Sequence, residues 1–375
     1  MARIFHCADI HLDSPFSLVN PREAERRRTE LRAAFTSALM FARQQKTELF
    51  FISGDLFDCD YVTRDTKDML VSEFSKMPQC RFFISPGNHD PYNEASPYKT
   101  IDFPKNVHIF GAKKECVCID ELGVDIYGIG FTSPVFETSP IIGYTIKNKD
   151  RVNILVCHGD TTSPLSTNGP ITKNEIAASG FDYIALGHIH KASGLLCENN
   201  VYYAYPGCIE GRGFDETGYK GALYGEIEKG KVILRTQIFS KRRYEIINID
   251  IDGASSKTQA LEVIRNKIRV YTDDTALRII LSGRVTEGFI ISENEIGRGR
   301  EFPYYIEIVD RTTVLPSFSE LEKSSTLKGV FYKKMSEKMD TAAPSSDEFL
   351  TALQALKYGL CALDDRNVID FSEED

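Results

Sequence analysis

Residues 185–191 read Ala-Leu-Gly-His-Ile-His-Lys and place two of the chain's seven histidines two positions apart, directly after the apolar run 181–185. Such a run is typical of a buried strand. Alternate side chains of an extended chain point the same way, so His188 and His190 are directed at one target. Two converging imidazoles suggest a metal site, whereas an isolated His-x-His pair is as a rule two ordinary loop residues. The rest of the chain decides between these interpretations.

Four other apolar strands also run into loops that carry side chains able to bind a metal. They are Asp9 and His11 after the strand 2–8, Asp55 and Asp58 after the strand in 48–57, Asn88, His89 and Asp90 after the strand in 80–90, and His158 and Asp160 after the strand in 151–160. In open α/β sheets, ligands collect outside the carboxyl ends of the strands, so the five loops are expected to meet at one place. The pair at 188 and 190 therefore belongs to a larger constellation.

The first 240 residues alternate strand and helix, which is the rhythm of a layered α/β sheet. One helix is predicted to begin at Asn20, another to cover 64–77, and a third to begin with a Thr172/Glu175 capping box. The segments 115–130 and 221–239 read as hairpins, and 317–339 and 345–365 as amphipathic helices. A basic, polar stretch at 240–244 marks the predicted boundary, which gives a domain at 1–240, a small α+β cap domain at 241–310 and a C-terminal helical segment at 311–375.

The length, apolar runs, cysteine count and net charge of the chain limit the classes of protein to which it can belong. With 375 residues, two domains are the natural expectation. No apolar run reaches the roughly 18 residues needed to span a bilayer, and the N-terminus lacks a signal-peptide pattern, so a cytoplasmic protein without a membrane partner is expected. Nine scattered cysteines do not form a disulfide framework. A net charge of −9 argues mildly against extensive phosphate-binding surfaces, although the basic clusters at 26–32 and 241–243 are either a local groove or ordinary solvated segments.

The ordered motifs resemble those of the calcineurin-like metallophosphoesterases. Five stretches carry the resemblance: "HCADIHLDSPF", "ISGDLFD", "SPGNHD", "VCHGD" and "IALGHIHK". More narrowly they are similar to the nuclease subunits of the SbcCD and meiotic-recombination type and to the YhaO-like DNA repair exonucleases. The resemblance covers residues 1 to about 240 and is much weaker beyond. It implies a four-layer α/β/β/α sandwich followed by the smaller cap domain.

The resemblance also implies a metal centre with two divalent ions, most simply Mn²⁺, with Fe²⁺ or Zn²⁺ as alternatives. Asp9, His11 and His190 would hold one ion, Asn88, His158 and His188 the other, and Asp55 would bridge them. This mixture of carboxylate, amide and imidazole ligands suits those metals. Two cations roughly 3.5 to 4 Å apart would bind a phosphate ester and activate a bridging hydroxide as the nucleophile.

The remaining polar residues of the motifs are expected to assist. His89 would stabilise charge or protonate the leaving oxygen, with Asp90 fixing its tautomer; a purely structural role for His89 is the alternative. Asp58 and Asp160 are expected to orient ligating groups. Arg212, in the glycine-rich segment 205–221, would approach a substrate phosphate, although a simple turn explains this segment almost as well. His6 is expected to be a packed core residue.

The function implied is a metal-dependent phosphodiesterase that cleaves DNA, as exonuclease or endonuclease. One alternative is a phosphomonoesterase or nucleotide hydrolase with the same two metals, although "GDLFDCD" lacks the arginine typical of the family's protein phosphatases. Another is a catalytically silent subunit of an SbcC-type ATPase complex. The family suggests such an ATPase as a partner on the C-terminal helices, and a homodimer through 64–77, although residues such as Leu70, Phe74 and Met77 are more often simply core.

Overall fold

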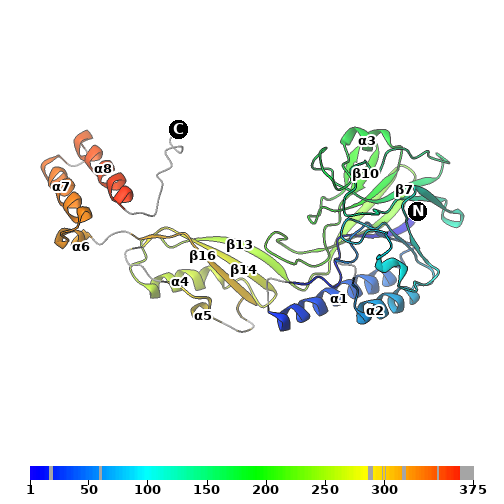
Figure 1. Cartoon of the computed structure of the whole chain (residues 1–375), viewed down its shortest axis with the longest axis horizontal. Coiled ribbons are helices and arrows are strands. Elements are labelled where there is room, and N and C mark those ends of the chain that lie inside the picture. Colours follow the sequence, from blue (N-terminus) through cyan, green and yellow to red (C-terminus); the bar gives the residue numbers. More distant parts are fainter. Residues whose placement is uncertain are drawn as a thin grey trace. The chain divides into compact units, whose positions relative to one another are not determined.

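Two six-stranded sheets lie at the centre of the N-terminal part of the chain in the computed structural model (Figure 1). The first has the order β12-β11-β1-β2-β3-β4, with β1 to β4 parallel, and the second β5-β6-β7-β8-β10-β9. The strands of the first sheet are β1 (Ala2–Cys7), β2 (Leu49–Ile52), β3 (Arg81–Ile84), β4 (Val107–Ile109), β11 (Gly221–Glu228) and β12 (Lys231–Ile238). Those of the second are β5 (Glu115–Ile119), β6 (Val124–Gly128), β7 (Val152–His158), β8 (Tyr183–Gly187), β9 (Leu196–Glu198) and β10 (Val201–Ala204).

Helices cover the outer face of each sheet, which makes four layers. The first sheet packs against α1 (Pro21–Gln44) and α2 (Arg64–Ser75), and the second against α3 (Lys173–Ala178). Both sides of each sheet are buried, so neighbouring residues of one strand enter different cores: Phe50 faces the helices and Phe51 faces the other sheet. The expected α/β/β/α sandwich is confirmed.

Local sequence signals place the helices as expected. The Asn20 side chain accepts a hydrogen bond from the backbone N–H of Glu23 at the start of α1, and the predicted capping box begins α3. The helix predicted at 64–77 is α2, with Thr63 as its cap. Both predicted hairpins are present as β5–β6 and β11–β12. Two short 3₁₀ helices, Pro97–Lys99 and Asp120–Leu122, complete this part of the chain.

The chain divides into two compact units, Met1–Glu245 with Asp274–Ala276, and Ile246–Asp273 with Leu277–Asp375. The structure describes residues 1–16, 20–58, 61–285, 290–297, 299, 301–314, 318–343 and 346–363. The end of the predicted helical segment, 364–375, lies outside the described residues. The further separation of 241–310 from 311–375 stays a prediction.

The second unit contains a three-stranded sheet of order β13-β14-β16 with α4 packed on one face. The first residues of β13 and β14 belong to the first unit. The elements from there on are β13 (Arg243–Asp250), α4 (Lys257–Ile268), β14 (Thr275–Ser282), β15 (Arg284–Val285), α5 (Glu293–Ile296), β16 (Tyr305–Asp310), β17 (Thr313–Val314), α6 (Phe318–Lys323), α7 (Leu327–Thr341) and α8 (Asp347–Leu363). The first predicted C-terminal helix is thus two helices, α6 and α7. No helix in the described part of the chain has both the length and the apolar character that crossing a membrane requires.

Candidate metal centre

The five motif loops meet at one edge of the two sheets. Loops after β1, β2 and β3 come from the first sheet, and those at the ends of β7 and β8 from the second. Backbone hydrogen bonds tie neighbouring loops together: the N–H of His11 donates to the carbonyl of Asp55 at 2.9 Å, and that of Gly159 to Gly187 at 3.1 Å. The chain therefore brings donors from residues 9 to 190 to one place.

Several of the predicted ligands have an unusual backbone conformation. The φ angles of Asp9, His11 and Asp55 are 51°, 52° and 51°, and that of His188 is 110°. Residues other than glycine rarely adopt a positive φ, because the conformation is strained. Residues with such backbone strain concentrate at functional sites, where the surrounding structure stabilises it. Gly54 also has a positive φ of 93°, and a Cβ atom there would lie 2.2 Å from Nδ1 of His158.

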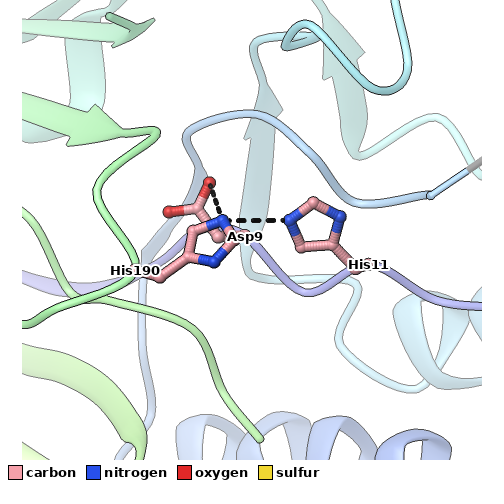
Figure 2. Close-up of side chains that lie close together, drawn as sticks. All are labelled: Asp9, His11 and His190. Carbon is pink, nitrogen blue, oxygen red and sulfur yellow. Dashed lines mark hydrogen bonds and ion pairs between the residues drawn. The ribbon is translucent and has the colours of Figure 1, made fainter. Parts of the chain in front are cut away.

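Asp9, His11 and His190 form the first cluster of donors, and Figure 2 shows their side chains directed toward one another. The Nε2 atoms of His11 and His190 are 3.2 Å apart, and Nε2 of His190 lies 4.0 Å from Oδ1 of Asp9. Asp9 and His11 are buried, whereas the side chain of His190 is 28% exposed. The cluster is thus open to solvent on the His190 side.

Asn88, His158 and Asp55 form the second cluster. Nε2 of His158 lies 2.9 Å from Oδ1 of Asn88 and 3.5 Å from Oδ2 of Asp55. The same Asp55 oxygen lies 3.8 Å from Nε2 of His11, so it faces both clusters. The ring of His188 lies 5.2 Å from that of His158, centroid to centroid. All seven predicted ligands therefore surround one region, with Asp55 between its two halves.

The rings of His11, His190 and His158 each form a hydrogen bond through Nδ1, which turns their Nε2 atoms toward the centre. Nδ1 of His11 contacts Asp58 at 2.7 Å, Nδ1 of His190 contacts Glu216 at 2.6 Å, and Nδ1 of His158 contacts the Ser53 carbonyl at 2.9 Å. Ionised carboxylates and carbonyls only accept, so Nδ1 must carry the proton in each neutral ring and Nε2 must be bare.

Bare Nε2 atoms that face one another and carboxylate oxygens repel in the absence of a cation. The pairs of His158 with Asn88, His158 with Asp55 and His11 with Asp55 are acceptors facing acceptors at 2.9 to 3.8 Å. This donor set of imidazoles, carboxylates and one amide oxygen is the one that Mn²⁺, Fe²⁺ or Zn²⁺ takes. The residues present thus fit the divalent cations that the sequence predicts.

The pKa values of His158, His11 and Asp55 suit metal binding, whereas Asp9 has a raised pKa and, for His190, burial is outweighed by the hydrogen bond to Glu216, which raises the pKa. Burial lowers the pKa of His158 to about 4 and also lowers that of His11, so both rings are neutral at pH 7. Burial opposes ionisation of Asp55, but the surrounding histidines and the backbone N–H of His89, which donates to Asp55 at 3.0 Å, hold its pKa below the usual value. Burial raises the pKa of Asp9 to about 7.

Asp58, not Asp90, is the carboxylate beside His89, which corrects one expectation. Oδ1 of Asp58 lies 3.1 Å from Nδ1 of His89, and the same oxygen accepts the bond from His11. The Asp90 carboxylate is turned inward, where it accepts hydrogen bonds from the backbone N–H groups of Gly87 at 2.7 Å and Phe57 at 3.1 Å. Asp90 therefore shapes the loop, and the conformation of 87–90 directs its side chain away from its neighbour's ring.

The Asp160 carboxylate also forms hydrogen bonds within its own loop. Its Oδ1 accepts hydrogen bonds from the N–H and hydroxyl of Thr162 at 2.7 and 2.6 Å, and its Oδ2 lies 3.9 Å from Nε2 of His188. The hydrogen bonds to Thr162 outweigh partial burial and hold the pKa of Asp160 below its usual value. It lies beside the proposed ligand His188, and its predicted role of orienting a ligating group stays a prediction.

Glu216 is the residue that sequence reasoning missed. Its buried carboxylate receives the bond from His190 and also a bond of 3.1 Å from the Arg212 guanidinium, which lies 3.4 Å from Asp58 at its other end. Burial opposes ionisation of Glu216, but His190 and Arg212 hold its pKa well below the usual range. Glu216 lies 26 residues after His190 in a glycine-rich segment, and no spacing signal connects the two.

Arg27 and Arg242, one from each of the basic clusters at 26–32 and 241–243, are buried and do not face a substrate. Arg27 donates hydrogen bonds to Glu30 at 2.7 Å and Glu210 at 3.1 Å, and Arg242 donates to Glu30 at 2.8 Å. All four side chains are almost completely buried. These two arginines therefore belong to a buried ion network that ties α1 to the segment carrying Arg212.

Comparison with known proteins shows which family and which individual proteins the chain resembles. The family described as calcineurin-like phosphoesterase matches residues 2–192. The chain is 26% identical over 297 residues to the uncharacterized metallophosphoesterase YhaO of Bacillus subtilis, which covers 75% of this chain and 72% of that protein. It is 24% identical over 265 residues to the DNA double-strand break repair protein Mre11 of Saccharolobus solfataricus, with 67% of each covered. The third similarity is to SbcD, one of the subunits of the SbcCD nuclease of Staphylococcus epidermidis, 23% identical over 307 residues, with 72% and 75% covered.

Proposed function

The chain belongs to the calcineurin-like phosphoesterase family, and we propose that it is a two-metal phosphodiesterase that cleaves DNA. Members of this family are hydrolases of phosphoesters that bind divalent metals. Two of the similar proteins are named as a DNA repair protein and a nuclease, which supports nucleic acid as the substrate here.

The proposed ligands follow the two clusters of donors. Two bound divalent ions, which we propose to be Mn²⁺, would supply positive charge to polarise the phosphate and to activate water. Asp55 would bridge them, since one of its oxygens faces both clusters. The other ligands are Asp9, His11 and His190 on one side and Asn88, His158 and His188 on the other.

We propose that His89 moves a proton in the reaction. A water oxygen would form the new bond to phosphorus while the bond to the leaving oxygen breaks, and the water's proton passes to solvent. Nδ1 of His89 is engaged by Asp58, which leaves Nε2 to give a proton to the leaving oxygen. The hydrogen bond to Asp58 raises the pKa of His89, so the ring is more readily protonated than usual.

The ion pairs of Arg212 favour a phosphodiester over a phosphomonoester as the substrate. Its guanidinium lies beside the centre but is already bound to Glu216 at 3.1 Å and to Asp58 at 3.4 Å. A phosphomonoester carries close to two negative charges at pH 7 and a diester one. A site whose neighbouring guanidinium is already paired with two carboxylates compensates the single charge of a diester more easily.

Parallel assays with added Mn²⁺ test this proposal. We expect cleavage of linear single-stranded DNA and of bis-p-nitrophenyl phosphate, with kcat/KM for this diester at least about tenfold above that for p-nitrophenyl phosphate. Activity on the monoester alone would replace the nuclease by a phosphomonoesterase or nucleotide hydrolase.

The His89→Ala variant distinguishes an enzyme from a silent subunit of an ATPase complex. We expect a loss of roughly 10²- to 10⁴-fold in kcat with metal content retained. The matched control is His108→Ala, which removes a histidine on β4 that pairs with Glu115 outside the centre. Equal, measurable turnover in all three proteins would remove His89 from the mechanism, whereas no turnover in any of them would leave only a partner-binding role.

The partners proposed for this chain are DNA, an SbcC-type ATPase and a second copy. The ATPase proposal rests on the named similarity to a component of the SbcCD nuclease. For the homodimer, Leu70 and Phe74 of α2 and the nearby Met77 lie in the core of their own unit. These three residues are therefore accounted for by the fold, and a dimer through α2 would have to use its polar face.

A further inference from the structure

A small polar network crosses the apolar interior between the two sheets beneath the metal centre. His6 of β1 contacts the Tyr183 hydroxyl of β8 through Nδ1 at 2.8 Å and the Ser53 hydroxyl, just after β2, through Nε2 at 3.0 Å. All three residues are completely buried. Their surroundings are apolar side chains such as Ile4 and Phe51 of the first sheet. Polar groups are costly in such a place unless each is hydrogen-bonded.

The bonds of this network permit one assignment of its protons. The Ser53 hydroxyl donates to the backbone carbonyl of Ala185 on β8 at 2.9 Å, so its oxygen accepts from Nε2–H of His6. Nδ1 of the same ring is then bare and accepts from the Tyr183 hydroxyl. Burial lowers the pKa of His6 to about 3, which agrees with a neutral ring. Every polar atom of the imidazole is satisfied.

Ser53 connects this network to the metal centre. Its backbone carbonyl accepts the hydrogen bond from Nδ1 of His158, the bond that turns the other nitrogen of that ring toward Asn88 and Asp55. The same carbonyl is in close contact with β8, since a Cβ atom on Gly187 would lie 1.8 Å from it. A shift of Ser53 would therefore move a proposed ligand and the end of β8 together.

The centre itself consists of two halves, one on each sheet. Asp9, His11, Asp55 and Asn88 follow strands of the first sheet, whereas His158, His188 and His190 come from the ends of β7 and β8 in the second. Apolar packing between the sheets is nondirectional, so it does not set their register to a fraction of an ångström. The directional bond from His6 of β1 to Tyr183 of β8, and that from Ser53 to Ala185 of β8, supply that constraint.

We propose that His6 is a positioning residue, which joins the two sheets through Tyr183 and Ser53. It thereby fixes the distance between the metal ligands that follow strands of the first sheet and those at the ends of β7 and β8 in the second. This inference rests on the proposed metal site and not on the choice of DNA as substrate. It assigns a role to a buried histidine that the sequence identifies only as core.

Mn²⁺ affinity, measured by calorimetry on the metal-free full chain, tests the role. We expect His6→Leu, which keeps the volume but removes both bonds, to weaken Mn²⁺ binding about 10- to 100-fold, the range seen when groups that orient metal ligands are lost. His6→Gln, whose amide offers one acceptor and one donor, should recover most of the affinity. Tyr183→Phe should weaken binding, and combining it with His6→Leu should add little, because both changes interrupt the same chain of bonds.

Phe5→Leu is the matched control. Phe5 neighbours His6 on β1 but faces the helices, so its shortening lowers the melting temperature without touching the network. Wild-type Mn²⁺ affinity in His6→Leu, with only the melting temperature lowered as in the control, would overturn the proposal. If His6→Leu fails to fold, the Mn²⁺ affinity of Tyr183→Phe tests the proposal by the same criterion. A wild-type chain that binds two Mn²⁺ ions but leaves DNA intact would refute the nuclease alone, whereas one that binds no metal would refute both.

Discussion

Replacement of Asp58 by asparagine is the sharpest test of how the centre is organised. One oxygen of Asp58 lies 2.7 Å from Nδ1 of His11, 3.1 Å from Nδ1 of His89 and 3.4 Å from Nη1 of Arg212. The other accepts the Ser14 hydroxyl at 2.7 Å. Asparagine keeps the shape but loses the charge that holds these groups.

The expected magnitude follows from the bond to His11. A hydrogen bond to a charged group contributes roughly 1.5–3 kcal/mol, and a loss of about 2 kcal/mol corresponds to roughly 30-fold weaker Mn²⁺ binding. Turnover should also fall at saturating Mn²⁺, because His89 loses the carboxylate that orients its ring. Calorimetry gives the affinity, and hydrolysis of bis-p-nitrophenyl phosphate gives kcat.

Asp102→Asn is the matched control, since Asp102 is exposed and outside the motif loops. Its affinity and turnover should equal those of the wild type. Wild-type values for Asp58→Asn as well would refute the argument that this carboxylate orients both His11 and His89.

Two further changes probe the scaffold. Gly54→Ala should cost at least about 1–2 kcal/mol of folding free energy because of the positive φ at this position, which thermal melts would measure. The added Cβ would also contact His158, so Mn²⁺ binding measured by calorimetry should be weaker. Arg242 and Arg27 outweigh burial and lower the pKa of Glu30 to about 2 from an ordinary 4.5. A lowered pKa stabilises the fold above about pH 4.5, and this contribution, about 2 kcal/mol after screening, is lost as pH falls toward 2. Urea unfolding at pH 7 and pH 3 should show that loss in the wild type and a smaller one in Glu30→Gln; equal losses would contradict it.

Local sequence patterns predicted most of the strands and helices of the first unit, although not β4, β9 or β10, and they named the side chains that the fold brings together. The apolar runs predict the central strands, and the caps at Asn20 and Thr172 mark where two helices begin, because both signals arise within a few residues. The five motif loops identify the family. The break between α6 and α7 was not anticipated, since an amphipathic pattern continues across it.

Pairings between distant segments required the folded chain. The sequence identifies His190 but not Glu216, and it favours Asp90 over Asp58 as the partner of His89 because adjacency in sequence is all that it offers. His6 reads as an ordinary core residue for the same reason. A hydrogen bond depends on atoms within about 3 Å and on their direction. Which of many carboxylates and hydroxyls satisfies that condition is decided when two sheets pack and five loops meet, so the tertiary structure alone assigns these partners.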